Sequence, residues 1–442
     1  MGTFTTAMLS ASRARKAMVG IIAGFFIQGF MAVAWVPRIP EIIDNISVPF
    51  STWGLIVGIA GLGGLIPLLF ASRLVNKFGS RPLLQVSFVV ACLSFASFGF
   101  IHNPALFFAA LFAQNFAYGV YNIVVNAHSV VFQDRIGRVI LGRFHASWSI
   151  GAALSALLTG FFATFVPLQV YLALAAGVSA VVCLVGTGMI LGPKEDGHDQ
   201  EQKRASSVPL FKTPRYVVIL AFGLFFAVLP EATVIDWSAI FAKKVLHLAT
   251  GWQGAPYSLF VIAMIVGRLA LGRLSRRRHL SRIGQIAAVL GAISLTIAVL
   301  AGTILANISP MLALAVTAVF WILTGLGAGP QVPAIFSNGG TVETMTTAQA
   351  MSRMSLMNSL LILLAKILMG AMAQGIAVES VFLPALLAFV GVALIHRYLV
   401  NRSKSLPPVP GYDDQPVDAF PVTSPQAAIS ESEIPEGERL QP

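Results

Sequence analysis

Long apolar runs separated by short polar loops occupy most of the 442-residue chain. The first six runs lie at residues 17–37, 52–71, 83–101, 105–131, 144–165 and 168–191. After a polar stretch at residues 192–215, six more lie at 216–237, 253–272, 283–304, 310–336, 350–374 and 379–396. A helix needs about 20 apolar residues to cross a hydrocarbon core of about 30 Å. The pattern therefore predicts an all-α membrane protein with twelve transmembrane helices.

The composition excludes a soluble globular domain. The chain is 56% hydrophobic and 11% charged, whereas soluble domains carry about 25% charged residues. In a soluble protein the formal net charge of +11 would suggest nucleic acid as a partner. Here the basic residues concentrate in alternate loops, which is the distribution that positive-inside sorting produces. We therefore expect no nucleic-acid binding.

The basic loops also predict the orientation of the chain in a cell membrane. The loops expected inside contain Arg13, Arg15 and Lys16; Arg73, Lys77 and Arg81; Arg135, Arg138 and Arg143; and the segments 192–215 and 272–282. The loops expected outside retain Arg38, Lys243 and Lys244. With twelve spans, both termini are predicted to be cytoplasmic.

An internal repeat predicts the domain organisation. The segment GFFIQGFMAVAWVPRIP at 24–40 matches GLFFAVLPEATVIDWSA at 223–239, and Trp53 matches Trp252 at nearly the same offset. Because both copies have the same orientation, the repeat is parallel, and the first run is a retained helix rather than a cleaved signal peptide. The expected parts are an N-terminal segment (1–16), a six-helix bundle (17–191), a central loop (192–215), a second bundle (216–396) and a disordered acidic tail (397–442).

The loops after the second helix of each half resemble a motif of the major facilitator superfamily, G-x-x-x-D-[RK]-x-G-[RK]-[RK]. The first copy has Ser72, Asn76, Lys77, Gly79 and Arg81, and the second has Gly272, Arg276 and Arg277. Asn76 and Arg276 replace the acidic residue of the motif. The resemblance implies two bundles around a central cavity, alternating access, and a gating role for Lys77, Gly79, Arg81, Gly272 and Arg277.

Other segments are similar to a narrower bacterial group. WVPRIPEI, FHASWSIG, EATVIDW and IVGRLALGRL resemble inner-membrane members distantly akin to sugar permeases of the fucose-permease type. This resemblance implies a location in the inner membrane, and it implies no substrate. The fifth helix, SWSIGAALSALLTG, lacks the proline of drug/proton antiporters, which makes drug antiport a weaker interpretation.

Two acids in the seventh run are candidates for transport chemistry. An ionisable group at membrane depth costs at least about 2.5–3.5 kcal/mol, so it usually faces a cavity or a partner. Pro230 interrupts the helix ladder just before Glu231, and we expect Glu231 to bind the coupling proton; a structural acid and a substrate ligand are the alternatives. Asp236 is expected near the outer interface, where it could form an outer gate with Arg38.

Polar residues at helical spacing predict a substrate site. Asn115, Tyr118, Asn122, Asn126 and Ser129 lie on one stripe of the fourth helix. This stripe could face the cavity or bond to neighbouring helices. Further candidate ligands are Gln28, Trp148, Trp321 and Lys366. Lys366 could instead be the counter-ion of Glu231. Arg268 and the segment 273–278 are expected at lipid headgroups, and a role in the inner gate is the alternative.

The sequence contains no Walker-type loop, catalytic triad or metal-ligand spacing, so we expect no enzyme activity, no cofactor and no metal site. The function predicted is secondary active, proton-coupled transport of a small solute by a monomer whose other partners are membrane lipids. One alternative is an exporter of amphiphilic compounds, with Phe25, Phe26, Tyr118, Trp148 and Trp321 lining the cavity. The other is a non-transporting sensor that signals through the tail.

Overall fold

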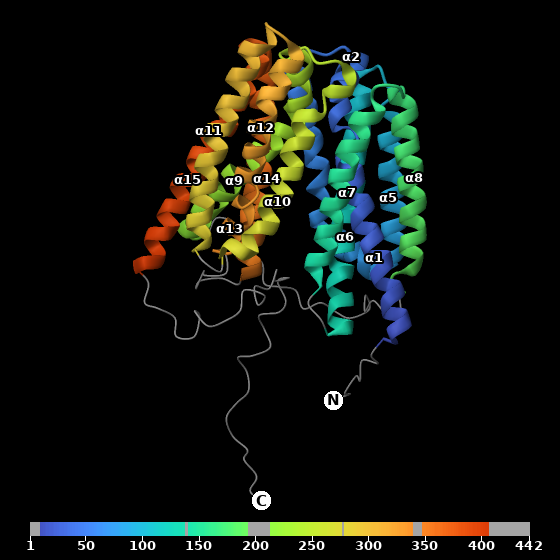
Figure 1. Cartoon of the computed structure of the whole chain (residues 1–442). Coiled ribbons are helices and arrows are strands. Elements are labelled where there is room, and N and C mark those ends of the chain that lie inside the picture. The colour runs from blue at the N-terminus through green and yellow to red at the C-terminus, as the bar shows by residue number, and fades with distance from the viewer. Residues whose placement is uncertain (1–8, 138–139, 193–212, 276–277, 339–346, 406–442) are drawn as a thin grey trace, which may run out of the picture.

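The computed structural model describes residues 9–137, 140–192, 213–275, 278–338 and 347–405, and all its regular elements in these ranges are helical. Two groups of helices stand side by side in Figure 1.

The elements divide into two halves along the chain. The first half contains α1 (Ala11–Val33), η1 (Val36–Arg38), α2 (Ile39–Ile46), α3 (Phe50–Ala60), η2 (Gly61–Gly64), η3 (Ile66–Leu69), α4 (Ala71–Phe78), α5 (Ser80–Ser97), α6 (Pro104–Ile136), α7 (Leu141–Phe162) and α8 (Leu168–Met189). The second contains α9 (Arg215–Lys244), η5 (Thr250–Trp252), α10 (Ala255–Ser275), α11 (Leu280–Ala306), α12 (Pro310–Ala328), α13 (Gln331–Phe336), α14 (Thr347–Gly375), η7 (Val378–Val381) and α15 (Phe382–Ser405).

The predicted membrane spans correspond to these helices. Eleven segments of the described chain are long and apolar enough to cross a membrane. The twelfth predicted span is α7, which has 22 residues and packs against α1 but is less apolar because Arg143, His145 and three serines lie in it. The all-α membrane fold predicted from the sequence is confirmed.

The two halves repeat the same packing. In the first half α1 packs against α7 and α8, and α5 packs against α6 and α8. In the second half α9 packs against α14 and α15, and α11 packs against α12 and α15. The equivalent helices therefore have equivalent neighbours, as a parallel repeat requires.

The outer surface suits a lipid environment. On α8, for example, Leu174, Val178, Val181 and Val185 are each about 60% exposed and recur at spacings of three and four, which places them on one face of the helix. An apolar face of this kind is solvated by lipid tails rather than by water.

Both ends of the described chain lie at the same end of the bundle, at the bottom of Figure 1. We call this the terminal end, and the end that carries α2 the far end. At the far end Lys243 of α9 forms an ion pair with Asp44 of α2. The backbone N–H of Phe50 donates to the Gln374 side chain at 3.0 Å. These contacts join the two halves at the far end.

Glycines let α3 and α14 cross closely. A Cβ added to Gly54 would lie 2.7 Å from the Gly370 Cα atom, a separation at which the backbones would have to move apart. The pair therefore permits a close approach of the two halves, in the way that small residues do in membrane helix packing.

The limits predicted for the terminal segments need correction. Helix α1 begins at Ala11, inside the predicted N-terminal segment, and α15 continues to Ser405, inside the predicted tail. The Arg402 guanidinium lies 3.8 Å from the Tyr216 ring centroid, so the extension of α15 packs against the start of α9. Most of the predicted central loop and the tail beyond residue 405 lie outside the described residues.

Candidate functional site

A cavity of about 600 Å³ lies between the two halves, lined by side chains of α1, α6, α7 and α10. Its lining residues are Phe25, Gln28, Tyr118, Asn122, Asn126, Gly142, His145, Ala146, Trp148, Ser149, Ile150, Ile265, Arg268 and Leu269. Gln28 lies 17 residues after the start of α1, about 25 Å along the helix at 1.5 Å per residue. His145 lies in the first turns of α7. The cavity therefore extends from the middle of the bundle toward the terminal end.

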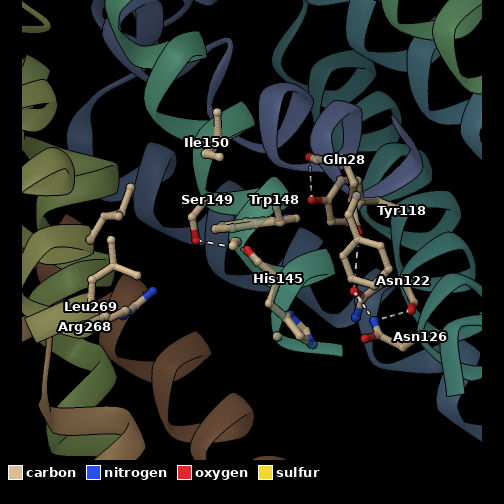
Figure 2. Close-up of a pocket in the computed structure, with 14 residues that line it drawn as sticks. Gln28, Tyr118, Asn122, Asn126, His145, Trp148, Ser149, Ile150, Arg268 and Leu269 are labelled. Atoms are coloured by element: carbon tan, nitrogen blue, oxygen red, sulfur yellow. Dashed lines mark hydrogen bonds between the residues drawn. The ribbon is translucent and has the colours of Figure 1, made fainter. Parts of the chain in front are cut away.

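Amide side chains form one wall of the cavity (Figure 2). The Gln28 Nε2 group donates to Asn122 Oδ1 at 2.9 Å, and the Asn126 Nδ2 group donates to the Asn122 carbonyl oxygen at 2.7 Å. The Tyr118 hydroxyl donates to the Gln28 carbonyl oxygen at 2.9 Å. Gln28 is 1% exposed, and its Oε1 atom has no hydrogen-bond partner among the described residues. The wall thus combines fixed amides with one unused acceptor.

The α7 side of the cavity is aromatic and mostly uncharged. Trp148 and His145 line it, and the Phe25 ring of α1 lies edge-on to the His145 ring with centroids 5.4 Å apart. The Ser149 hydroxyl donates to the His145 carbonyl oxygen at 3.2 Å, so it satisfies its own helix. Figure 2 shows Trp148 between the amide wall and Arg268.

Arg268 of α10 provides the positive charge of the cavity. Its Nη2 atom donates to Glu231 Oε2 at 2.8 Å, and the Arg268 and Glu231 side chains are 29% and 21% exposed. The buried Tyr257, also on α10, lies close enough to interact electrostatically with both charges. The expectation that Arg268 meets lipid headgroups is wrong, because the depth of Arg268 in α10 brings it level with Glu231.

The second acid of α9 has a different partner from the one predicted. Asp236 is buried, and its Oδ2 atom lies 2.9 Å from the Lys366 Nζ atom of α14. The predicted pair of Asp236 with Arg38 is therefore wrong, as is the alternative in which Lys366 is the counter-ion of Glu231. Lys366 does not line the cavity. The apolar run around Lys366 keeps its ammonium within the bundle, where Asp236 compensates its charge.

Arg38 forms hydrogen bonds to residues of its own half of the molecule. Its Nε and Nη2 atoms donate to the Glu41 carboxylate at 2.5 and 2.7 Å, and both terminal nitrogens donate to the Val166 carbonyl oxygen at 3.1 Å. Glu41 lies three residues later, on the first turn of α2. A bidentate bond to so near an acid leaves Arg38 anchored at the far end of the first half.

Besides Lys366, two more predicted substrate ligands, Trp321 and Asn115, lie outside the cavity. Trp321 is fully buried within the second half, where its ring packs against Phe241 and Phe382 with centroids 6.2 and 5.8 Å away. Asn115 donates to the Leu111 carbonyl oxygen at 2.9 Å and lies beside Gly63 of η2. The stripe on α6 is longer than the cavity, so its part nearer the far end packs against η2.

The structure describes four of the five residues for which the family resemblance implied a gating role. Gly79 adopts φ 77°, a conformation that glycine tolerates without strain, and joins α4 to α5. The Arg81 Nη2 group donates to the Gly188 carbonyl oxygen at 3.0 Å. Lys77 and Gly272 are exposed, and Arg277 lies outside the described residues. Arg81 therefore ties α5 to the end of α8 within one half.

The described part of the chain has no cluster of three or more His, Cys, Asp or Glu residues that could hold a metal ion. Its two described cysteines, Cys92 and Cys183, are free and buried. The chemistry that the cavity offers is therefore that of amides, aromatic rings and one arginine.

Comparisons with known proteins agree with the fold. An uncharacterised MFS-type transporter of Yersinia pestis is 28% identical over 368 residues, which cover 79% of this chain and 87% of that protein. An uncharacterised transporter of Sinorhizobium fredii, y4wD, is 25% identical over 345 residues, covering 76% and 86%. The crystal structure of the nucleoside transporter NupG is similar with a TM-score of 0.68 at 15% identity, covering 86% of this chain and 98% of that one.

The Major Facilitator Superfamily model matches residues 18–342. This match covers well over half of the chain, and it includes every residue that lines the cavity and both copies of the sequence repeat at 24–40 and 223–239. The protein belongs to the Major Facilitator Superfamily and is a membrane transporter.

Proposed function

We propose that this protein is a secondary active transporter that moves a small polar solute together with a proton by alternating access. The solute binds in the cavity between the amide wall of α1 and α6 and the Arg268 side of α10. Glu231 carries the proton. The observation that carries the proposal is the ion pair of Glu231 with Arg268, a residue that lines the cavity. Glu231 does not line the cavity itself, but its side chain is 21% exposed, so the carboxylate has both a counter-ion and partial access to water.

The arrangement of the two ends supports alternating access. The far end holds the halves together through Asp44 with Lys243 and through the crossing of Gly54 with Gly370. The cavity extends from the middle of the bundle toward the terminal end. A rocking motion of the two halves would close the terminal end and separate these far-end contacts.

The basic loops support an orientation with the terminal end in the cytoplasm. Arg13 donates to the carbonyl oxygens of Met189 and Ile190 at 2.7 Å, and Arg353 donates to Thr213 at 2.9 Å, all at the terminal end. Basic residues at that end favour the cytoplasmic side. These residues support a location in a cell membrane, the inner membrane in a bacterium, with both termini inside. That the protein acts as a monomer stays a prediction.

Proton coupling follows from the chemistry of the pair. Protonation of Glu231 removes the negative charge that holds Arg268, which frees the guanidinium to act on the solute or on the opposite half. His145 and Tyr257 also lie near this site. A neutral Glu231 and a charged Glu231 thus favour different arrangements of α9 and α10, which links proton binding to the conformational change.

The proposal is tested on the purified protein. A panel of small solutes is first screened by thermal shift, since a ligand of the native state raises its apparent stability. Each solute that binds is then added to proteoliposomes containing a pH-sensitive dye. We expect the solute gradient to drive proton movement in the wild type. In Glu231→Gln the solute should still bind, while solute-driven proton movement is lost.

A matched control uses the acid of η7. Glu379 belongs to the same half but lies in a turn at the far end, so Glu379→Gln should move protons like the wild type. Undiminished proton movement in Glu231→Gln would refute coupling through this carboxylate. Preferential binding of bulky apolar solutes would instead favour an exporter of amphiphilic compounds.

A further inference from the structure

The two walls of the cavity offer opposite kinds of hydrogen bonding. On the amide wall, the Oε1 atom of Gln28 is buried and has no partner among the described residues. A buried acceptor without a donor costs about 1–3 kcal/mol. A solute that brings an O–H or N–H group to this atom would remove that cost, so the wall is suited to a hydroxylated or amino-bearing solute.

The opposite wall offers a cation. Within the described part of the chain, the Arg268 guanidinium makes one side-chain hydrogen bond, from Nη2 to Glu231. A guanidinium has five N–H donors in a planar fork that matches a carboxylate in bidentate geometry. Arg268 therefore has donors left for an anion in the cavity.

The charges at this wall limit the net charge that a bound anion can carry. Glu231 and Arg268 together are neutral, so an arriving monoanion adds one negative charge, and a proton on Glu231 compensates that charge. Tyr257 of α10 interacts electrostatically with both charges of the pair, and His145 of α7 lines the same cavity. A dianion would need a second cation. Arg268 is the one Lys or Arg among the described residues that line the cavity, and Lys366 of α14 is bound to Asp236.

We propose that the cavity binds a small hydroxylated monocarboxylate, whose carboxylate competes with Glu231 for Arg268 and whose hydroxyl group donates to Gln28 Oε1. This inference rests on the proposed function and names its substrate class. A cavity of about 600 Å³ is in the range of known small-molecule sites, about 300–1,000 Å³. The carbon skeleton would lie against Trp148 and Phe25, which line the cavity between the two walls.

The test compares gluconate with sorbitol, which has the same six-carbon chain with a hydroxymethyl group in place of the carboxylate. Hexanoate, a carboxylate without hydroxyls, and glucose 6-phosphate, a dianion, complete the set of probes. Binding to the purified protein is measured by calorimetry. We expect gluconate to bind at least about tenfold more tightly than sorbitol, since hydrogen bonds to charged groups contribute about 1.5–3 kcal/mol. Hexanoate and glucose 6-phosphate should both bind more weakly than gluconate.

Substitutions in the two walls show which wall is responsible for each difference in solute affinity. Arg268→Gln should reduce gluconate affinity to that of sorbitol and leave sorbitol unchanged. Gln28→Leu should weaken gluconate and sorbitol but not hexanoate. Arg273→Gln is the matched control, because Arg273 lies on α10 but is exposed and does not line the cavity. If Arg268→Gln fails to fold, Arg268→Lys keeps the charge, and we expect a partial loss of gluconate affinity.

Competition with Glu231 gives an outcome that a structural ion pair would not produce. In Glu231→Gln the competing carboxylate is gone, so gluconate should bind more tightly than to the wild type at neutral pH. Unchanged or weaker gluconate binding in this variant would overturn the proposed competition.

Equal binding of gluconate and sorbitol, or binding of neither, would overturn the substrate class. The proposed function would survive if a neutral solute drove proton movement that Glu231→Gln abolished. Conversely, Arg268-dependent binding of gluconate without proton movement would refute coupling and leave the substrate class intact.

Discussion

Two acids on α9, five residues apart, have different surroundings. Glu231 pairs with Arg268; both side chains are partly exposed, and Arg268 lines the cavity. Asp236 pairs with Lys366; the Asp236 side chain is 4% exposed and the Lys366 side chain 22%. The first pair connects α9 to the neighbouring α10, and the second connects α9 to α14, which crosses the other half. Two acids on one helix therefore differ in their surroundings. We interpret the first pair as accessible to water and solute and the second as a contact that holds the bundle together.

Free energy explains why the two pairs should differ in role. A buried charge is expensive to leave alone, so a buried pair stays together. A partly exposed pair is weak, because water screens both charges and solvates them when they separate. The clear difference lies in the two acids, since Asp236 is 4% exposed and Glu231 21%. We therefore expect Glu231 to exchange its partner at a lower cost than Asp236. Substitutions at either pair, or at the helix crossing beside the second pair, test this difference.

The largest effect should come from Lys366→Met. Removing the ammonium leaves the Asp236 carboxylate buried without its counter-ion, which costs about 3–5 kcal/mol when one partner of a buried pair is lost. The apparent melting temperature of the purified variant in detergent should fall clearly. Replacing both residues, in Lys366→Met with Asp236→Leu, should recover much of the loss. A single variant as stable as the wild type would show that Asp236 is not held by this pair.

A smaller effect is expected at the crossing that adjoins the second pair. Gly370→Ala puts a methyl group where the Gly54 Cα atom lies 2.7 Å away, and overpacking of this kind costs about 1–3 kcal/mol. Distances between spin labels at Asn45 and Lys244, on opposite halves at the far end, should lengthen. The native cysteines are buried and should react little with the label.

The matched control for this crossing lies on the same helix. Gly375 has open space where a Cβ would be added, so Gly375→Ala should leave the label distances unchanged. Equal distances in Gly370→Ala and the wild type would mean that the close approach of α3 and α14 does not hold the far end closed.

The sequence predicted the helices well because their signal is local. Runs of apolar residues and the repeat of segments 24–40 and 223–239 are readable without contacts, and they yield the spans and the two halves. The ends were less readable: Arg402 stacks on Tyr216, a contact between residues far apart in sequence, and this contact accompanies the extension of α15 into the predicted tail.

The candidate site was predicted in part. Gln28, Tyr118, Asn122, Asn126 and Trp148 do line one cavity, since helical spacing and depth place them. The partners of the acids were not predictable, because pairing depends on which helices adjoin α9. Arg268 was missed as a cavity residue because it lies at the end of the apolar run 253–272 and was assigned to the lipid headgroups together with the basic segment that follows, although it lies more than a helical turn before Arg273. Trp321 was predicted to bind the solute, but a tryptophan can carry a polar indole N–H group and still be buried in the core, as Trp321 is.

The smallest effect on stability should come from Glu231→Gln, which is the counterpart of the change at Lys366. Both partners of the Glu231 pair are partly exposed, so the loss should be about 0.2–1 kcal/mol, as for screened ion pairs. The melting temperature should change little, while Asp236→Asn, the same substitution in the buried pair, should lower it clearly. Because the two variants differ from the wild type by the same atoms on the same helix, their difference measures the surroundings of each acid. Equal destabilisation would mean that Glu231 is as fixed as Asp236, and a fixed carboxylate could not exchange Arg268 for a proton.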